Sequence, residues 1–177
     1  LIKRLEEEAQ KEHPEKLRYV LRDLAAKEGA FAYEYTGYLA NIHSVETYYQ
    51  ANLDMLNQQK FYSLFSPNQK IHTKVKNEEP TYYASGSKVN TSQFASGSII
   101  EGEVDKSIIS RNVRINKDSL VKESLIFPRV VIAKGAQVEY AIVDKGAEIA
   151  EGVVIRGTAE NPVIIKKGEK VTEDVLS

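Results

Sequence analysis

The chain has 177 residues, in which 24 Lys and Arg nearly balance 25 Asp and Glu. This near-neutral charge and the lack of a basic stripe argue against nucleic acid as a partner. The absence of cysteine excludes disulfides and thiolate metal sites and fits a cytoplasmic protein. No apolar run is long enough to span a bilayer, so we expect no membrane partner.

The first 26 residues are polar, with apolar side chains at helical spacing. We predict two helices that are separated by the break at His13-Pro14, the second of them ending at Gly29. Leu1 lies inside the first helical pattern and no capping residue precedes it. We therefore expect that residues precede it in the natural protein.

Phe31–Tyr35 alternates apolar and polar residues and is predicted to be a strand. Ser44 is the expected N-cap of a third helix with one apolar stripe. From Asn57 to about Gln93 the sequence is rich in turn residues. These patterns predict two or three helices and one strand in residues 1–60, a linker with entry strands in residues 61–93, and a separate β domain in residues 94–177.

A period of seventeen residues runs through the second half of the chain. It places β-branched aliphatic residues in three columns, one per face of a coil. The columns are Val104, Val121, Val138 and Ile155; Ile109, Ile126 and Val143; and Ile115, Ile132 and Ile149. A repeat this short must be one coil of a solenoid, because a single coil cannot bury its apolar side without neighbours.

Steps of six, six and five residues divide each coil into three short faces. The sequence therefore predicts a mainly β fold, a parallel β-helix shaped as a triangular prism with hexapeptide-like coils. Its predicted core consists of nine residues of these columns: Ile109, Ile115, Val121, Ile126, Ile132, Val138, Val143, Ile149 and Ile155. On the N-terminal side of the repeats, Ile99–Gly102 aligns with Ile132–Gly135, with one residue fewer between the turns. On the C-terminal side, the pattern is interrupted at Gly157–Pro162, as expected of a terminal coil.

Two stretches resemble the ADP-glucose pyrophosphorylase family. Phe31–Leu56 resembles the end of its nucleotidyltransferase domain, where the pattern is roughly GYWxDVGTxxxYxxANxDLL, and Val104–Ile155 resembles its C-terminal left-handed β-helix. The resemblance implies that residues 1–60 are the helical remnant of an α/β nucleotidyltransferase domain. It also implies left-handed winding and a role in making ADP-glucose from glucose 1-phosphate and ATP for glycogen biosynthesis.

One departure from the family pattern bears on catalysis. Asn41 stands where the family has an Asp, which the resemblance implies is a ligand of the catalytic Mg²⁺. Mg²⁺ needs anionic oxygen ligands, and phosphoryl transfer depends on the metal to offset phosphate charge. We therefore expect no catalytic residue, metal or other cofactor in this chain, and a parent subunit with little or no activity.

The resemblance extends to GlgD-type regulatory subunits, which implies a GlgC-type catalytic subunit or a second copy of the chain as partner. The β-helix would then serve assembly and regulation. Three alternatives stay open: the C-terminal part of an active sugar-1-phosphate nucleotidyltransferase, a hexapeptide-repeat acyltransferase, and a purely structural cap. The acyltransferase would need a His on a coil as general base, and all three His, at positions 13, 43 and 72, precede the coils.

Overall fold

The computed structural model describes residues 1–31, 33–66, 71–72, 74 and 76–177. The chain divides into two compact units, Leu1–Thr36 and Gly37–Ser177. The helix after Ser44 packs on the solenoid within the second unit, and the domain boundaries expected near residues 60 and 93 stay predictions. The two units are described separately.

The first unit contains the two predicted helices, α1 (Ile2–Ala9) and α2 (Leu17–Glu28). Gly29 follows α2 with a φ of 76°, a value that favours glycine. The buried Glu8 carboxylate links α1 to the connection before α2, because it lies 2.6 Å from the Lys11 ammonium and accepts a hydrogen bond from the Glu15 N–H. Lys11 and the Glu15 N–H hold the pKa of Glu8 below its ordinary value.

The strand expected at Phe31–Tyr35 is not found. Of the described residues in this stretch, 31 and 33–35, none lies in a strand, and Ala32 lies outside the described residues. Phe31 and Tyr33 are almost fully exposed. Alternating residues form a strand only beside a partner that receives their backbone hydrogen bonds, and this unit contains two helices and no described strand.

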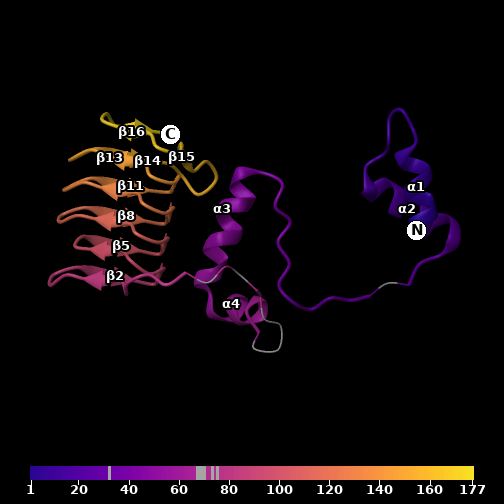
Figure 1. The fold of residues 1–177 in the computed structure, drawn as a ribbon, viewed down its shortest axis with the longest axis horizontal. Helices are drawn as coiled ribbons and strands as arrows, with labels where there is room; N and C mark the ends of the chain where they lie inside the picture. The colour runs from indigo at the N-terminus through magenta and orange to yellow at the C-terminus, as the bar shows by residue number, and fades with distance from the viewer. Residues whose placement is uncertain (32, 67–70, 73, 75) are drawn as a thin grey trace. The chain divides into compact units, whose positions relative to one another are not determined.

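The second unit is dominated by a solenoid of six stacked coils, as the period predicts (Figure 1). All pairings between coils are parallel, and each coil contributes one strand to each of three sheets, except that the third sheet has five strands. The first sheet contains β1 (Tyr82–Tyr83), β4 (Ile99–Ile100), β7 (Arg114–Ile115), β10 (Val131–Ile132), β13 (Glu148–Ile149) and β16 (Lys170–Val171). The second contains β2 (Lys88–Asn90), β5 (Glu103–Asp105), β8 (Leu120–Lys122), β11 (Gln137–Glu139), β14 (Val154–Arg156) and β17 (Val175–Leu176). The third contains β3 (Gln93–Phe94), β6 (Ile108–Ile109), β9 (Leu125–Ile126), β12 (Ala141–Val143) and β15 (Val163–Ile165).

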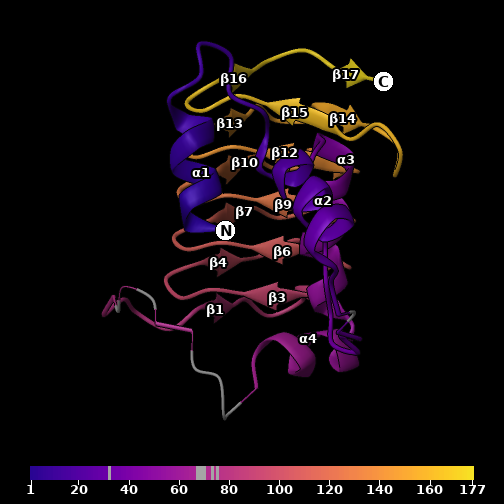
Figure 2. The same ribbon diagram turned by 90° about the vertical axis from the view of Figure 1, so that its right-hand side faces the viewer.

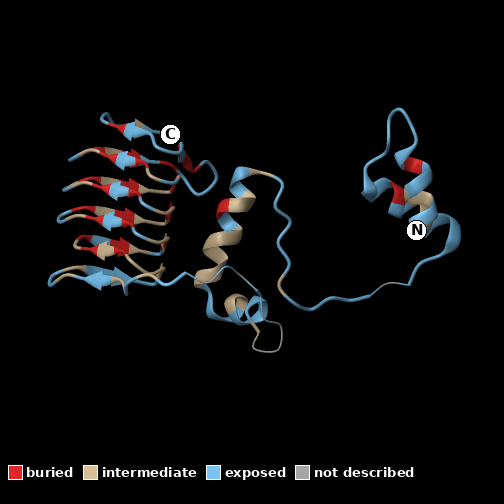
Figure 3. Cartoon of the chain, viewed as in Figure 1, coloured by how far each residue is buried: buried red, intermediate tan, exposed pale blue. Residues whose placement is uncertain are grey.

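The three predicted columns form the core of the solenoid (Figure 3). The strand register places Val121 on Val104, Ile126 on Ile109 and Ile132 on Ile115. All nine predicted core residues are at most 1% exposed. Like residues therefore stack directly above one another, and each coil buries the inward side chains of its neighbours. The left-handed winding stays a prediction from the family resemblance.

The first coil lies in the stretch expected to hold a linker and entry strands, since Tyr82 in β1 already pairs with Ile99. The predicted alignment of Ile99 with Ile132 is wrong by one place, since Ile100 pairs with Ile115 and so shares its column with Ile132. The corner before Val104 is two residues short rather than one. Gly102 is needed there, because a Cβ would lie 2.6 Å from the Ser119 carbonyl oxygen.

The last coil is irregular, as expected. Val163 pairs with Ala141, a spacing of 22 residues instead of 17, because the loop at Gly157–Pro162 adds five residues. Ile155 keeps its column and is fully buried. An insertion at a corner leaves the stacking intact because it projects away from the strands.

Three helical segments precede the solenoid within the second unit. They are α3 (Val45–Leu53), the short 3₁₀ helix η1 (Asp54–Leu56) and α4 (Gln58–Leu64). The sequence predicted α3 with its Ser44 cap, but α4 lies in the stretch expected to be linker. Among the described residues, no helix is long and apolar enough to cross a membrane.

Replacing Ile132 by Ala tests the stacked columns. Because Ile132 is fully buried between Ile115 and Ile149, the cavity should lower the free energy of unfolding by about 2–5 kcal/mol. The neighbouring Val131, whose side chain points outward and is 36% exposed, provides the control, and Val131→Ala should lower it by less than about 1 kcal/mol. Urea unfolding of both variants measures the difference; equal losses would contradict a core made of stacked columns.

Candidate functional site: the junction of helix and solenoid

Helix α3 lies along the outward side of the third sheet (Figure 1). Three successive outward residues of this sheet are apolar: Ile108, Leu125 and Ile142 follow one another on neighbouring coils. Tyr49 of α3 packs on them and is only 1% exposed. The solenoid therefore has a second apolar surface, outside its core, that holds the helix.

The start of α3 is fixed by a capping box. The Ser44 hydroxyl accepts from the Thr47 N–H, and the Thr47 hydroxyl accepts from the N–H groups of His43 and Ser44. These bonds satisfy N–H groups that have no partner within the helix. His43 thus contributes its backbone N–H to the helix start.

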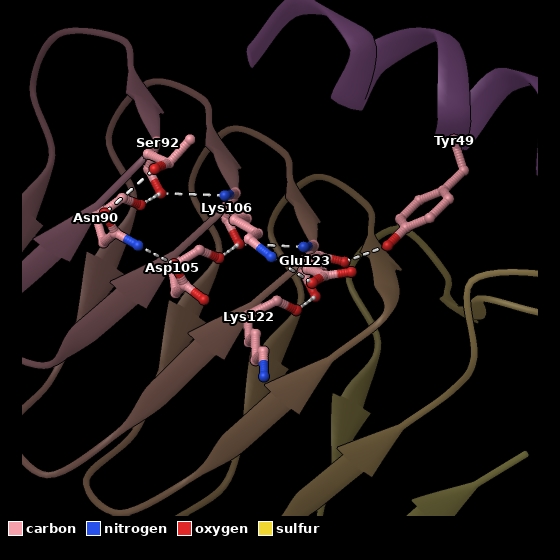
Figure 4. Close-up of polar contacts among 10 residues, drawn as sticks. Tyr49, Asn90, Ser92, Asp105, Lys106, Lys122 and Glu123 are labelled. Carbon is pink, nitrogen blue, oxygen red and sulfur yellow. Dashed lines mark hydrogen bonds and ion pairs between the residues drawn. The ribbon is translucent and has the colours of Figure 1, made fainter. Parts of the chain in front are cut away.

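Tyr49 also makes a polar contact with the solenoid (Figure 4). Its hydroxyl donates a hydrogen bond to the backbone carbonyl of Glu123, at the corner between β8 and β9. Glu123 has a φ of 43°, so the chain bends sharply at this point. Burial, together with the nearby Glu123 and Tyr140, raises the pKa of the Tyr49 phenol, so the hydroxyl remains a donor at neutral pH.

A ladder of serines supports this corner (Figure 4). The hydroxyls of Ser92, Ser107 and Ser124 each donate to the carbonyl two residues earlier. Each also accepts from the N–H of the equivalent residue in the next coil, at 3.0–3.1 Å, and the ladder ends at the N–H of Ala141. The serine hydroxyls thus give a partner to the N–H groups of Ser107, Ser124 and Ala141, for which no backbone acceptor is found among the described residues.

At the other end of α3, the Asp54 carboxylate collects three donors. Lys60 lies 2.8 Å from it, and the Gln50 amide and the Tyr38 hydroxyl each lie at 3.1 Å. Burial alone would raise the pKa of Asp54, but the hydrogen bonds from Lys60, Gln50 and Tyr38 outweigh it, so the pKa lies below its ordinary value. Burial and Asp54 raise the pKa of Tyr38. The carboxylate therefore stays charged and the phenol neutral.

Asn41 lies in the segment that leads into α3, and it is exposed. The described residues contain no group of three His, Cys, Asp or Glu placed to hold a metal ion. The residues around Asn41 therefore do not by themselves fit Mg²⁺, which prefers several anionic oxygen ligands. That the chain carries no cofactor of its own stays a prediction.

The structure separates the residues singled out in the sequence. The nine core residues lie inside the prism, whereas Asn41 lies outside the solenoid on the segment before α3. The sequence reasoning did not identify Tyr49 as the link to Glu123, or Asp54 as the residue that joins Tyr38 to Lys60. The recurrence of an apolar residue at Ile108, Leu125 and Ile142, on the outward side of a sheet, was the available signal for a covering helix.

The matching family model is described as GlmU-like, C-terminal hexapeptide, and covers residues 73–174. The chain belongs to this family. It is also 36% identical over 160 residues to glycogen biosynthesis protein GlgD of Bacillus subtilis (strain 168), covering 88% of the chain and 47% of that relative.

Further relatives are the glucose-1-phosphate adenylyltransferases of Bacillus mycoides (strain KBAB4) and Bacillus cereus (strain ATCC 10987). Each is 31% identical over 140 residues, which cover 78% of this chain and 37% of the relative. The chain therefore spans less than half the length of these relatives. They confirm the resemblance to ADP-glucose pyrophosphorylases. The range that matches the hexapeptide family includes strands β1–β16 and ends just before β17.

Tyr49→Phe tests the polar link between α3 and the solenoid. Loss of a buried hydrogen bond should lower the free energy of unfolding by about 1–2 kcal/mol near neutral pH. The raised pKa predicts the pH dependence. The unfolded state ionises first above the ordinary value of 10.0, so the stability from Tyr49 is complete below that pH and declines above it.

The difference in unfolding free energy between wild type and Tyr49→Phe should therefore shrink by about 1.4 kcal/mol per pH unit above pH 10. Urea unfolding at a series of pH values measures it. Tyr48→Phe, on the same helix, is the matched control, because it removes a phenol hydroxyl and leaves the bond between Tyr49 and Glu123 in place. A difference that stays constant through this range would contradict a neutral, buried Tyr49.

Proposed function

We propose that the chain is the C-terminal part of a regulatory or assembly subunit of glucose-1-phosphate adenylyltransferase in glycogen biosynthesis. In this role the solenoid is the rigid platform on which subunits assemble, and the segment before α3 belongs to a nucleotidyltransferase domain with weak or no activity of its own. Its partner would be a GlgC-type catalytic subunit or another copy of itself.

The observation that carries the proposal is Asn41. It occupies the family's metal-ligand position with a neutral amide, while the segment around it keeps an ordered path into α3. Loss of one carboxylate weakens a Mg²⁺ site because the ion depends on charge from its oxygen ligands. The similarity to GlgD over 88% of the chain supports the same assignment.

The solenoid offers no competing chemistry. Its coils contain no His or Cys, so the base and the thiolate on which many transferases rely are absent from residues 82–177. The coils form a stack of parallel strands around a buried aliphatic core. A rigid stack of this kind suits the positioning of domains and subunits, which favours a regulatory or assembly role over the acyltransferase alternative.

Co-expression with a GlgC-type subunit tests the proposal directly. The full-length protein alone should show little ADP-glucose synthesis, and the catalytic subunit with it should differ from the catalytic subunit alone in turnover, substrate affinity or effector response. Initial-rate assays and a co-purification measure both effects. Identical kinetics with and without the protein would remove the regulatory assignment.

Asn41→Asp tests the role of the lost carboxylate. If the missing charge limits metal binding, the variant of the full-length protein should gain Mg²⁺-dependent synthesis of ADP-glucose by about tenfold or more, the factor that corresponds to ~1.4 kcal/mol in the barrier. Asn161→Asp, which makes the same change of charge on the loop of the last coil, should leave the rate unchanged.

The alternative, an active nucleotidyltransferase, predicts the opposite pattern. The full-length protein would then be fully active with Asn41 in place, and Asn41→Asp would change little. The similarity to two glucose-1-phosphate adenylyltransferases keeps this alternative in view, so the activity of the unmodified full-length protein is the first measurement to make.

A further inference from the structure

The Asp54 carboxylate lies where three segments of the second unit meet. It accepts from Tyr38 of the segment before α3, from Gln50 near the end of α3 and from Lys60 in α4. Only 17% of the Asp54 side chain is exposed. A carboxylate with three donors at 2.8–3.1 Å holds its partners more tightly than a surface ion pair does.

Two anchors hold the segment that carries Asn41. On one side, the Tyr38 hydroxyl binds Asp54 and the Tyr38 N–H donates to the Ser63 hydroxyl at 3.1 Å. On the other side, the N–H of His43 donates to the Thr47 hydroxyl at the start of α3. Only residues 39–42 lie between the anchors.

The side chains between the anchors do not hold this segment by burial. Leu39 is 81% exposed and Ile42 is 55% exposed, and Asn41 is exposed as well. The path of the backbone at Asn41 is therefore set by the anchors at its two ends. Of these, the Thr47 anchor belongs to the helix start itself, whereas the Asp54 anchor joins the segment to the far end of the helix.

The Asp54 anchor is also close to the solenoid. The Met55 carbonyl, next in the chain, accepts a hydrogen bond of 2.6 Å from the Gln93 side chain in β3 of the first coil. Six residues before Met55, Tyr49 donates to the Glu123 carbonyl. Helix α3 and η1 are thus attached to the coils at two points, and Asp54 extends that attachment to Tyr38.

We propose that Asp54 is a positioning residue that fixes Asn41 relative to the solenoid through its hydrogen bond to Tyr38. A movement of the coils, such as one caused by a partner subunit, would reach position 41 through Met55, Asp54 and Tyr38. The proposal deepens the regulatory role and rests on it. The competing explanation is that Asp54 only joins α3 to α4 through Lys60.

Hydrogen exchange of the 177-residue chain separates these explanations. Asp54→Asn and Tyr38→Phe should each speed exchange of the hydrogen-bonded amides at the two ends of the segment, those of residues 38 and 43, by about fivefold or more, because each variant removes the buried anchor. Exchange in β8–β12 should stay unchanged. Lys60→Met removes only the link to α4, so it should leave exchange at residues 38 and 43 unchanged.

Tyr62→Phe is the matched control for Tyr38→Phe, because Tyr62 is a 58% exposed tyrosine of α4. Unchanged exchange at residues 38 and 43 in the Asp54 and Tyr38 variants would overturn the proposal. So would a Lys60→Met variant that matches Asp54→Asn, since Asp54 would then act only between the helices.

Activity of the full-length protein provides a separate readout. If Asn41→Asp gains activity, adding Tyr38→Phe should reduce kcat by about tenfold, whereas adding Tyr62→Phe should not. If Asn41→Asp gains nothing and the protein leaves the catalytic subunit unaffected, the proposed function fails. The exchange measurement still decides whether Asp54 positions Asn41.

Discussion

The stacking of aliphatic residues from coil to coil is the interaction on which the rest of the structure depends. A single coil has three strands of two or three residues, and alone it would leave its inner side chains in water. Stacked six high, the inner columns of Val and Ile are almost completely buried. The position of every corner follows from this stacking, since a strand that slipped by one residue would turn its apolar side chain outward.

The corners are where stacking and backbone geometry conflict. Lys106, Glu123 and Tyr140 occupy equivalent corners with φ between 43° and 50°, a region that side chains with a Cβ rarely adopt. The serine ladder offsets this strain by pairing backbone groups of adjacent coils. The bent backbone also presents the Glu123 carbonyl to Tyr49, so the same conflict provides the point at which α3 is attached.

The sequence predicted the repetitive part of this protein better than the irregular part. A period of seventeen identifies Ile109, Ile115 and Val121 as core because every coil repeats the same environment. It does not extend to the corner before Val104, where two residues are missing and the alignment shifts. It also could not reveal α4, whose sequence carries no long apolar stripe and whose start depends on the cap at Asn57.

The contacts between α3 and the coils were harder to predict because they join residues far apart in the sequence. Tyr49 and Glu123 are 74 residues apart, and Gln93 and Met55 are 38 apart. One of these bonds ends on a backbone carbonyl at a corner and the other on a helix carbonyl, and neither acceptor is specified by a side chain. The apolar stripe predicted for the helix after Ser44 indicated a packed face, but only the stacked coils determine which group the Tyr49 hydroxyl contacts.

Asn41 departs from the family pattern, whereas several residues around it agree with that pattern. The amide removes the charge that a metal would need, yet Gly37, Tyr38 and Asp54 agree with the family pattern, and Tyr38 and Asp54 bind each other here. A segment that served only to connect two domains would need no such anchor. A subunit that keeps the shape of this segment, while leaving catalysis to its partner, would need the bond between Tyr38 and Asp54 but not a carboxylate at position 41. The combination of this bond with the neutral Asn41 therefore supports the proposed regulatory role more strongly than the loss of the carboxylate does alone.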